Sequence, residues 1–111
     1  MGSEQGQPKR VVKLSRAATD DLAEIHRYTV HFWGERQADR YLDYLYDAIE
    51  SLADNPGQGR TLEDVPGALV SLVRWPRARH GHRIVYEAPD GELHVLRVVH
   101  SARDLATVLD E

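Results

Sequence analysis

Apolar residues recur at steps of three and four along two long segments, and this pattern predicts two amphipathic helices. A short strand is predicted over residues 9–14, and Ser15 stands directly after it, where the first helix needs an N-cap. Gly34 separates the two helices, so they should fold back on each other as a hairpin. The apolar stripes are Ala18, Leu22, Ile25, Thr29 and Phe32 in the first helix and Ala38, Tyr41, Leu42, Leu45, Ala48, Ile49 and Leu52 in the second.

The second half of the chain is rich in β-branched residues. Strands are predicted over residues 69–75, 82–88 and 92–100, with a loop over residues 58–67. A two-residue turn at Asp90-Gly91 would pair Tyr86 with Val95 and Ile84 with Arg97. In this register Arg97 faces the helices and His100 lies on the outer face of the sheet. The tail from Ser101 onward is predicted as a short helix or an extended arm.

Together these elements predict an α+β fold in the order β-α-α-β-β-β with a variable C-terminal tail. The helical hairpin should pack on a mostly antiparallel four-stranded sheet. The length of 111 residues suits one domain, expected over residues 9–111, and the polar residues 1–8 are expected to be disordered or tag-like. The chain has no cysteine and no apolar run of about 20 residues, which favours a cytoplasmic protein without a membrane span.

Charge is unevenly distributed along the chain, whose net charge is −4. Residues 20–54 hold nine acids against three bases, a net of −6, whereas residues 70–86 hold four arginines and no acid. This asymmetry suggests that a partner meets the basic half. The alternative is that the two halves of the chain attract one another.

The sequence gives little support for catalysis. It has no Gly-x-Ser-x-Gly motif and no glycine-rich phosphate loop. The pair His80 and His82 could share one side of a strand, but no third ligand is evident, so no metal site is predicted. Acid–base cleavage of RNA is the enzymatic candidate, using Tyr86 and His100 with the guanidinium groups of Arg83 and Arg97. In the predicted register Tyr86 and His100 lie on opposite faces, and an aromatic residue that alternates with Ile84 is more typical of a core.

Several short motifs, in order along the chain, resemble the RelE/ParE toxin superfamily and its ParE branch in particular. Each motif is weak alone, but the set covers nearly the whole chain from about residue 11 to residue 109. The motifs are Leu14-Ser15-Arg16-Ala17-Ala18 with Asp21, Leu22 and Ile25, then Phe32-Trp33-Gly34, Asn55-Pro56-Gly57-Gln58-Gly59-Arg60, Gly81-His82-Arg83-Ile84-Val85-Tyr86, and Arg97-Val98-Val99-His100-Ser101-Ala102-Arg103-Asp104.

The resemblance implies the toxin of a type II toxin–antitoxin system that inhibits DNA gyrase by direct binding. It also implies neutralisation by a ParD-like antitoxin in a hetero-oligomer, contact with operator DNA only through the antitoxin, and no cofactor. ParE-like members lack the RNA-cleaving residues of their RelE relatives, which agrees with the weak catalytic set found here. A RelE-like mRNA endoribonuclease is the alternative, and a member that mainly binds its antitoxin is a third possibility.

Two sets of residues are candidates for contact with partners. Those expected at the target surface are His100, Arg103, Arg83, Arg74, Arg77 and Trp75. Those expected at the antitoxin surface are Trp33, Leu105, Val108 and Leu109. Several also have a structural interpretation, because either tryptophan could pack in the core and the three tail residues could cap it. Arg97 is expected to be structural, paired with a helix carboxylate such as Glu24.

Overall fold

The computed structural model describes residues 9–110, so the N-terminal segment expected to be disordered lies outside the described residues. None of the helices within this described part is long and apolar enough to cross a membrane. In chain order the elements are β2 (Val11–Leu14), α1 (Arg16–Trp33), α2 (Glu35–Asp54), the 3-10 helix η1 (Pro56–Gln58), β3 (Arg60–Thr61), β4 (Leu69–Val73), β5 (His82–Glu87), β6 (Glu92–His100) and α3 (Leu105–Leu109).

The strands form one sheet in the order β2-β6-β5-β4-β3. β2 runs parallel to β6 and every other neighbouring pair is antiparallel, which confirms the predicted α+β fold and its mostly antiparallel sheet. The sequence predicted four strands and missed β3, which lies inside the expected loop. β3 has only two residues, Arg60 and Thr61, and such a short strand leaves no alternating pattern to detect.

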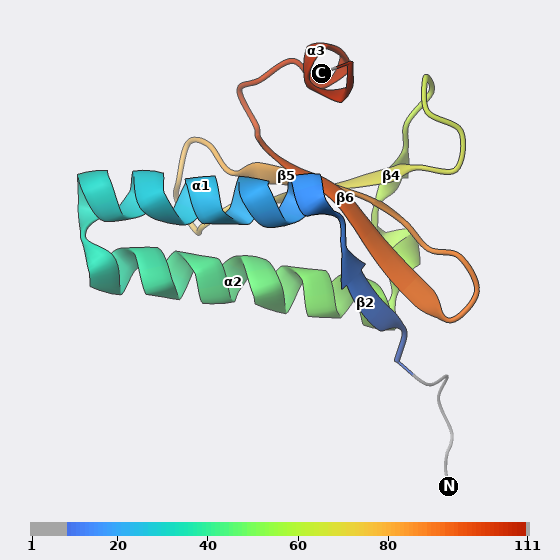
Figure 1. Cartoon of the computed structure of the whole chain (residues 1–111), viewed down its shortest axis with the longest axis horizontal. Coiled ribbons are helices and arrows are strands. Elements are labelled where there is room, and N and C mark those ends of the chain that lie inside the picture. Colours follow the sequence, from blue (N-terminus) through green and yellow to red (C-terminus); the bar gives the residue numbers. More distant parts are fainter. Residues whose placement is uncertain (1–8, 111) are drawn as a thin grey trace, which may run out of the picture.

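The two helices form the predicted hairpin. Ser15 caps α1, since its hydroxyl oxygen accepts a hydrogen bond from the Ala18 amide at 2.9 Å. Gly34 makes the turn between α1 and α2 with a positive φ of 89°, which an L side chain rarely adopts. The hairpin extends well past the sheet (Figure 1). Phe32, predicted to be buried, is therefore 58% exposed, because the end of α1 has no sheet beneath it.

The core lies between the helical hairpin and one face of the sheet. The helices contribute side chains that are at most 3% exposed, and the central strands contribute an equally buried set. The main core residues are Leu22, Leu45, Ile49 and Leu52 from the helices and Ile84, Tyr86, Leu93, Val95 and Val98 from the strands.

A β-bulge changes the register between β5 and β6. Tyr86 pairs with Val95, as the Asp90-Gly91 turn predicted, but the next pair is Val85 with Arg97, so Leu96 is an extra residue. The predicted pairing of Ile84 with Arg97 is wrong, because Ile84 pairs with Val98. Because side chains alternate between the two faces of a sheet, one inserted residue moves every later side chain of the strand to the opposite face.

The predicted faces of the last strand are therefore wrong beyond the bulge. Val98 belongs to the core between sheet and helices, and His100, two residues on, lies opposite His82. Because Tyr41 of α2 hydrogen-bonds the His82 ring, this is the helix side of the sheet. Arg97 leaves β6 on the other side, where its Nη1 donates to the Val108 carbonyl of α3 at 3.3 Å. Its guanidinium also reaches Asp21 of α1, which lies at the edge of β6 and accepts from the Val98 amide there.

The Asn-Pro-x-x-Gly motif that ends α2 has a structural role. Tyr86 is fully buried; its hydroxyl donates to the Pro56 carbonyl and accepts from the Gly59 amide at 3.1 Å. A Cβ atom at position 59 would collide with that hydroxyl, so the motif needs glycine there. Tyr86 is thus a core residue that holds the exit of α2 against the sheet.

Candidate functional site

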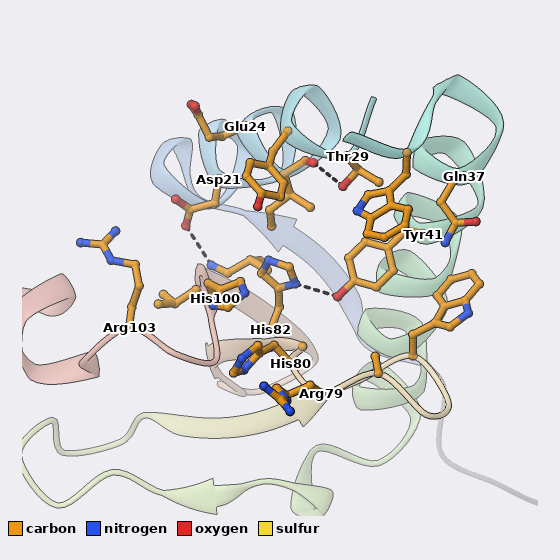
Figure 2. A pocket seen from close by; sticks show the side chains of 18 of the residues that line it. Asp21, Glu24, Thr29, Gln37, Tyr41, Arg79, His80, His82, His100 and Arg103 are labelled. Atoms are coloured by element: carbon orange, nitrogen blue, oxygen red, sulfur yellow. Dashed lines mark hydrogen bonds between the residues drawn. The ribbon is translucent and has the colours of Figure 1, made fainter. Parts of the chain in front are cut away.

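A groove of about 750 Å³ opens on the helix side of the sheet, where β6 ends. α1 and the start of α2 form one wall, and the segment after β4 forms the other (Figure 2). Two kinds of side chain line it. Its aromatic part includes Tyr28, Trp33, Tyr41 and Trp75, and its basic part includes Arg79, His80, His82, His100 and Arg103.

The aromatic part is unusually exposed. Tyr28 and Trp33 are 63% and 71% exposed, and Phe32, whose ring centroid lies 4.6 Å from that of Tyr28, is exposed as well. Trp75 is half-buried and packs between two helix side chains, with ring centroids 5.6 Å from Tyr41 and 5.0 Å from Tyr44. Large apolar side chains gathered at a surface in this way are typical of an interaction site.

Three histidines meet in the basic part of the groove. The ring centroids of His80 and of His82 each lie 5.4 Å from that of His100. The His82 Nδ1 atom is 2.6 Å from the Tyr41 hydroxyl. Burial, and secondarily the neighbouring His100, lower the pKa of His82 to about 4, so this ring is neutral at pH 7. Burial also raises the pKa of Tyr41 to about 12, which keeps the phenol protonated.

The backbone fixes the proton position on His100. The Ala102 amide donates to His100 Nδ1 at 3.0 Å, so the neutral ring carries its proton on Nε2. Burial and the nearby His80 lower the pKa of His100, which favours this neutral form. His100 is therefore a hydrogen-bond donor at the edge of the groove.

Arg97 and Asp21 form an ion pair at the inner end of the groove. Arg97 Nε donates to Asp21 Oδ2 at 2.8 Å and Nη2 donates to Oδ1 at 3.0 Å. Asp21 Oδ2 also accepts from the Val98 amide at 2.8 Å. The carboxylate that the structure places against Arg97 is thus Asp21, whereas the sequence suggested Glu24, which pairs with Arg27.

The structure separates the residues expected at the target surface. His100, Arg103 and Trp75 line the groove, together with Trp33, which the sequence assigned to the antitoxin surface. The other three are not among its lining residues. Arg83 donates to the Arg103 carbonyl at 3.4 Å, Arg74 lines a second groove between α2 and β4, and Arg77 is exposed in a turn with a positive φ of 69°.

The tail residues expected at the antitoxin surface lie in α3. Val108 is fully buried and Leu105 and Leu109 are half-buried, but none of the three belongs to the core between the hairpin and the sheet. α3 lies on the other side of β6, next to Arg97, and the assignment of its residues to the antitoxin surface stays a prediction. The sequence does not predict that other groove residues, notably Tyr28, Tyr41, Arg79 and His80, share one site with His100. The bulge at Leu96, which brings His100 to them, leaves no signal in the sequence.

Within residues 9–110 no three histidine, aspartate or glutamate side chains are arranged to hold a metal ion. His100 also accepts from a backbone amide on Nδ1, which leaves Nε2 protonated and without a lone pair for a metal.

Comparison with known proteins identifies relatives over most of the chain. The model of a family described as the ParE toxin of the type II toxin–antitoxin system parDE matches residues 12–105. Toxin ParE1 of Caulobacter vibrioides is 30% identical over 90 residues, covering 81% of this chain and 88% of the relative. Toxin ParE1 of Mycobacterium tuberculosis is 33% identical over 93 residues, covering 83% and 90%. A solved structure described as the chromosomal ParDE system from P. aeruginosa matches with a TM-score of 0.68 and 26% identity, covering 82% of this chain and 95% of that one.

Proposed function

Because this chain belongs to the ParE toxin family of type II toxin–antitoxin systems, we propose that it inhibits DNA gyrase by direct binding and is neutralised by a ParD-like antitoxin. The observation that carries the proposal is the groove beneath α1, with its exposed aromatic part and its basic part. Tryptophan, tyrosine and arginine are the residues most often found at the centre of protein interfaces. A binding protein needs such a surface and no catalytic set.

Neutralisation would follow from competition for this one groove. Trp33, assigned to the antitoxin surface, and Trp75, His100 and Arg103, assigned to the target surface, all line it. An antitoxin segment that fills the groove from Trp33 to Arg103 would also cover the target-binding residues. This arrangement requires no conformational change in the toxin, because the two partners exclude each other sterically.

Binding without catalysis is favoured over RNA cleavage by the state of the polar groups. A general base at neutral pH needs a pKa near 7, but burial lowers the pKa of His82 to about 4. The Tyr86 hydroxyl is committed to Pro56 and Gly59 and is fully buried. The net charge of −4 also gives little attraction for a polyanion such as mRNA.

The first experiment measures gyrase supercoiling in vitro together with mRNA integrity in cells that express the chain. We expect inhibited supercoiling and intact mRNA. Trp75→Ala and Arg103→Ala should weaken the inhibition at least roughly fivefold, since interface residues of these types commonly contribute more than 1 kcal/mol. Arg60→Ala is the matched control, because Arg60 is exposed on the edge strand β3, outside the groove lining. Rapid mRNA cleavage with normal supercoiling would contradict the proposal and support the endoribonuclease alternative.

A second experiment tests the antitoxin. A small neighbouring gene that encodes a ribbon-helix-helix protein is expected, and its product should co-purify with this chain. Trp33→Ala should weaken that complex. The substitution should leave the fold intact, because Trp33 is 71% exposed and packs little against the rest of the chain. A complex of unchanged affinity would place the antitoxin on a different surface.

A further inference from the structure

We infer that the basic end of the groove binds a single carboxylate, carried on an apolar peptide segment of a protein partner. The groove has two chemically distinct parts, with Trp33 and Trp75 in the aromatic one and His100 and Arg79 in the basic one. A segment with an apolar side chain next to an acidic group matches both parts at once. The inference rests on the proposed function and names the chemistry by which a partner enters that groove.

The first support is a fixed hydrogen-bond donor. The Ala102 amide occupies His100 Nδ1, so Nε2 carries the proton while the ring is neutral. The His100 side chain is exposed, so an incoming group can reach it. A donor held in one tautomer by the backbone suits an oxygen acceptor, and its bond to a carboxylate is charge-assisted and therefore strong.

The second support is the positive charge around this donor. The three imidazoles of His80, His82 and His100 lie between Arg79 and Arg103 (Figure 2). Arg79 is exposed and comes from the segment between β4 and β5. Both arginines line the same groove as His100, so they add positive charge to the surface that an anion would meet there. This charge arrangement favours an acidic side chain or a C-terminal carboxylate of the partner over a neutral amide.

The negative groups of the same groove decide between one carboxylate and a polyanion. Asp21 and Glu24 on α1 line the groove together with the histidines. Successive phosphates of a nucleic acid would meet these carboxylates, and the net charge of −4 adds to the repulsion. Asp21 is itself paired with Arg97 and Glu24 with Arg27, so a single carboxylate at the histidine end meets less repulsion than a run of phosphates would. Its apolar atoms can then lie toward the tryptophans.

A pair of small probes tests the inference on the whole chain. N-acetyl-L-phenylalanine offers an aromatic ring and a carboxylate, and its primary amide keeps the ring and removes the charge. We expect the acid to bind with a dissociation constant on the order of 1 mM, and the amide at least roughly fivefold more weakly. The titrations are followed by NMR at pH 7 and low salt, where the Ala102 amide and the His100 ring nitrogens should shift.

Three variants locate the donor. His100→Phe should abolish the preference for acid over amide, and His100→Gln, which keeps an N–H donor of similar reach, should retain part of it. His94→Gln is the matched control, because His94 lies near the opposite end of β6 and pairs with Glu92. It should bind the acid as the unmodified chain does.

Two results would overturn the inference. One is equal affinity for the acid and the amide, or a preference that survives His100→Phe. The other is tighter binding of a dinucleoside monophosphate than of N-acetyl-L-phenylalanine, which would make the basic end a nucleic-acid site. Neither gyrase nor an antitoxin is present in these titrations, so their outcome is separate from that of the supercoiling and co-purification experiments.

Discussion

Arg97 on β6 and Asp21 on α1 are joined by two hydrogen bonds, Nε to Oδ2 at 2.8 Å and Nη2 to Oδ1 at 3.0 Å. The same carboxylate accepts from the Val98 amide. β5 pairs with β6 on one side of Val98, but on the other side the pairing with β2 ends at Val95. Asp21 thus substitutes for a neighbouring strand and fixes the start of α1 against the sheet. Both side chains are less than 20% exposed, so the pair is largely shielded from solvent.

Loss of this carboxylate should be costly. Asp21→Ala removes the carboxylate that accepts two hydrogen bonds from Arg97 and one from the Val98 amide, and we expect the free energy of unfolding to fall by roughly 3 kcal/mol. Urea unfolding measures the change. Asp20→Ala is the matched control, since Asp20 is an exposed neighbour on the same helix and its loss should change stability by less than about 0.5 kcal/mol. Equal effects of the two substitutions would show that the pair contributes little.

Features that depend on residues close together in the sequence can be predicted from it, and features that depend on contacts between distant segments cannot. The helices and their cap at Ser15 follow from local periodicity, and the hairpin turn at Asp90-Gly91 sets the first pairs of β5 and β6 correctly. The bulge at Leu96 arises from packing between distant elements and has no local signal. For that reason Arg97 and His100 each lie on the face opposite to the one that the sequence predicts.

The groove could be predicted only in part for a related reason. The residue types and positions of Trp33, Trp75, His100 and Arg103 predict contact with partners, and the structure brings the four together in one groove. The spacing of Phe32 matches the helix stripe and predicts a core residue. Periodicity gives the face of a helix but not the length of sheet available to cover it, so the sequence does not predict the exposed end of the hairpin.

Tyr86 gives a second test of the fold. Tyr86→Phe removes the hydroxyl that accepts from the partly buried Gly59 amide and donates to the Pro56 carbonyl. We expect a loss of roughly 2 kcal/mol in the free energy of unfolding, because both groups lose their partner next to a fully buried ring. Thermal and urea unfolding should agree on this change. Tyr46→Phe, at a side chain 40% exposed, serves as control and should be nearly neutral. An equally stable Tyr86→Phe protein would mean that the hydroxyl does not hold the exit of α2.

Gly81 is required by close packing at the rim of the groove. A Cβ atom there would collide with the Val73 carbonyl and lie 2.9 Å from Arg74 Cα. Gly81→Ala should therefore lower the free energy of unfolding by roughly 2 kcal/mol through forced backbone movement. Gly57→Ala is the control, because a Cβ at that position meets only Asn55 Oδ1 at 3.5 Å, an ordinary contact. If both variants unfold at the same urea concentration, the crowding at Gly81 is relieved without cost.

Stability should fall at acidic pH because of His82. Burial lowers its pKa from 6.5 to about 4 in the folded chain, whereas the unfolded chain keeps the ordinary value. The unfolded state therefore takes up a proton first, and stability is constant above pH 6.5 and decreases between pH 6.5 and 4. Between about pH 7.5 and pH 5 this single group should lower the free energy of unfolding by roughly 2 kcal/mol.

Urea unfolding at several pH values measures the effect, and His82→Asn provides the comparison because it cannot titrate. Asparagine can still hydrogen-bond the Tyr41 hydroxyl, so much of the local structure should persist. The variant should lose less stability than the unmodified chain over the same pH interval, by about the amount assigned to His82. Parallel pH profiles for the two proteins would show that the His82 ring titrates alike in the folded and unfolded states and is not shielded by Tyr41.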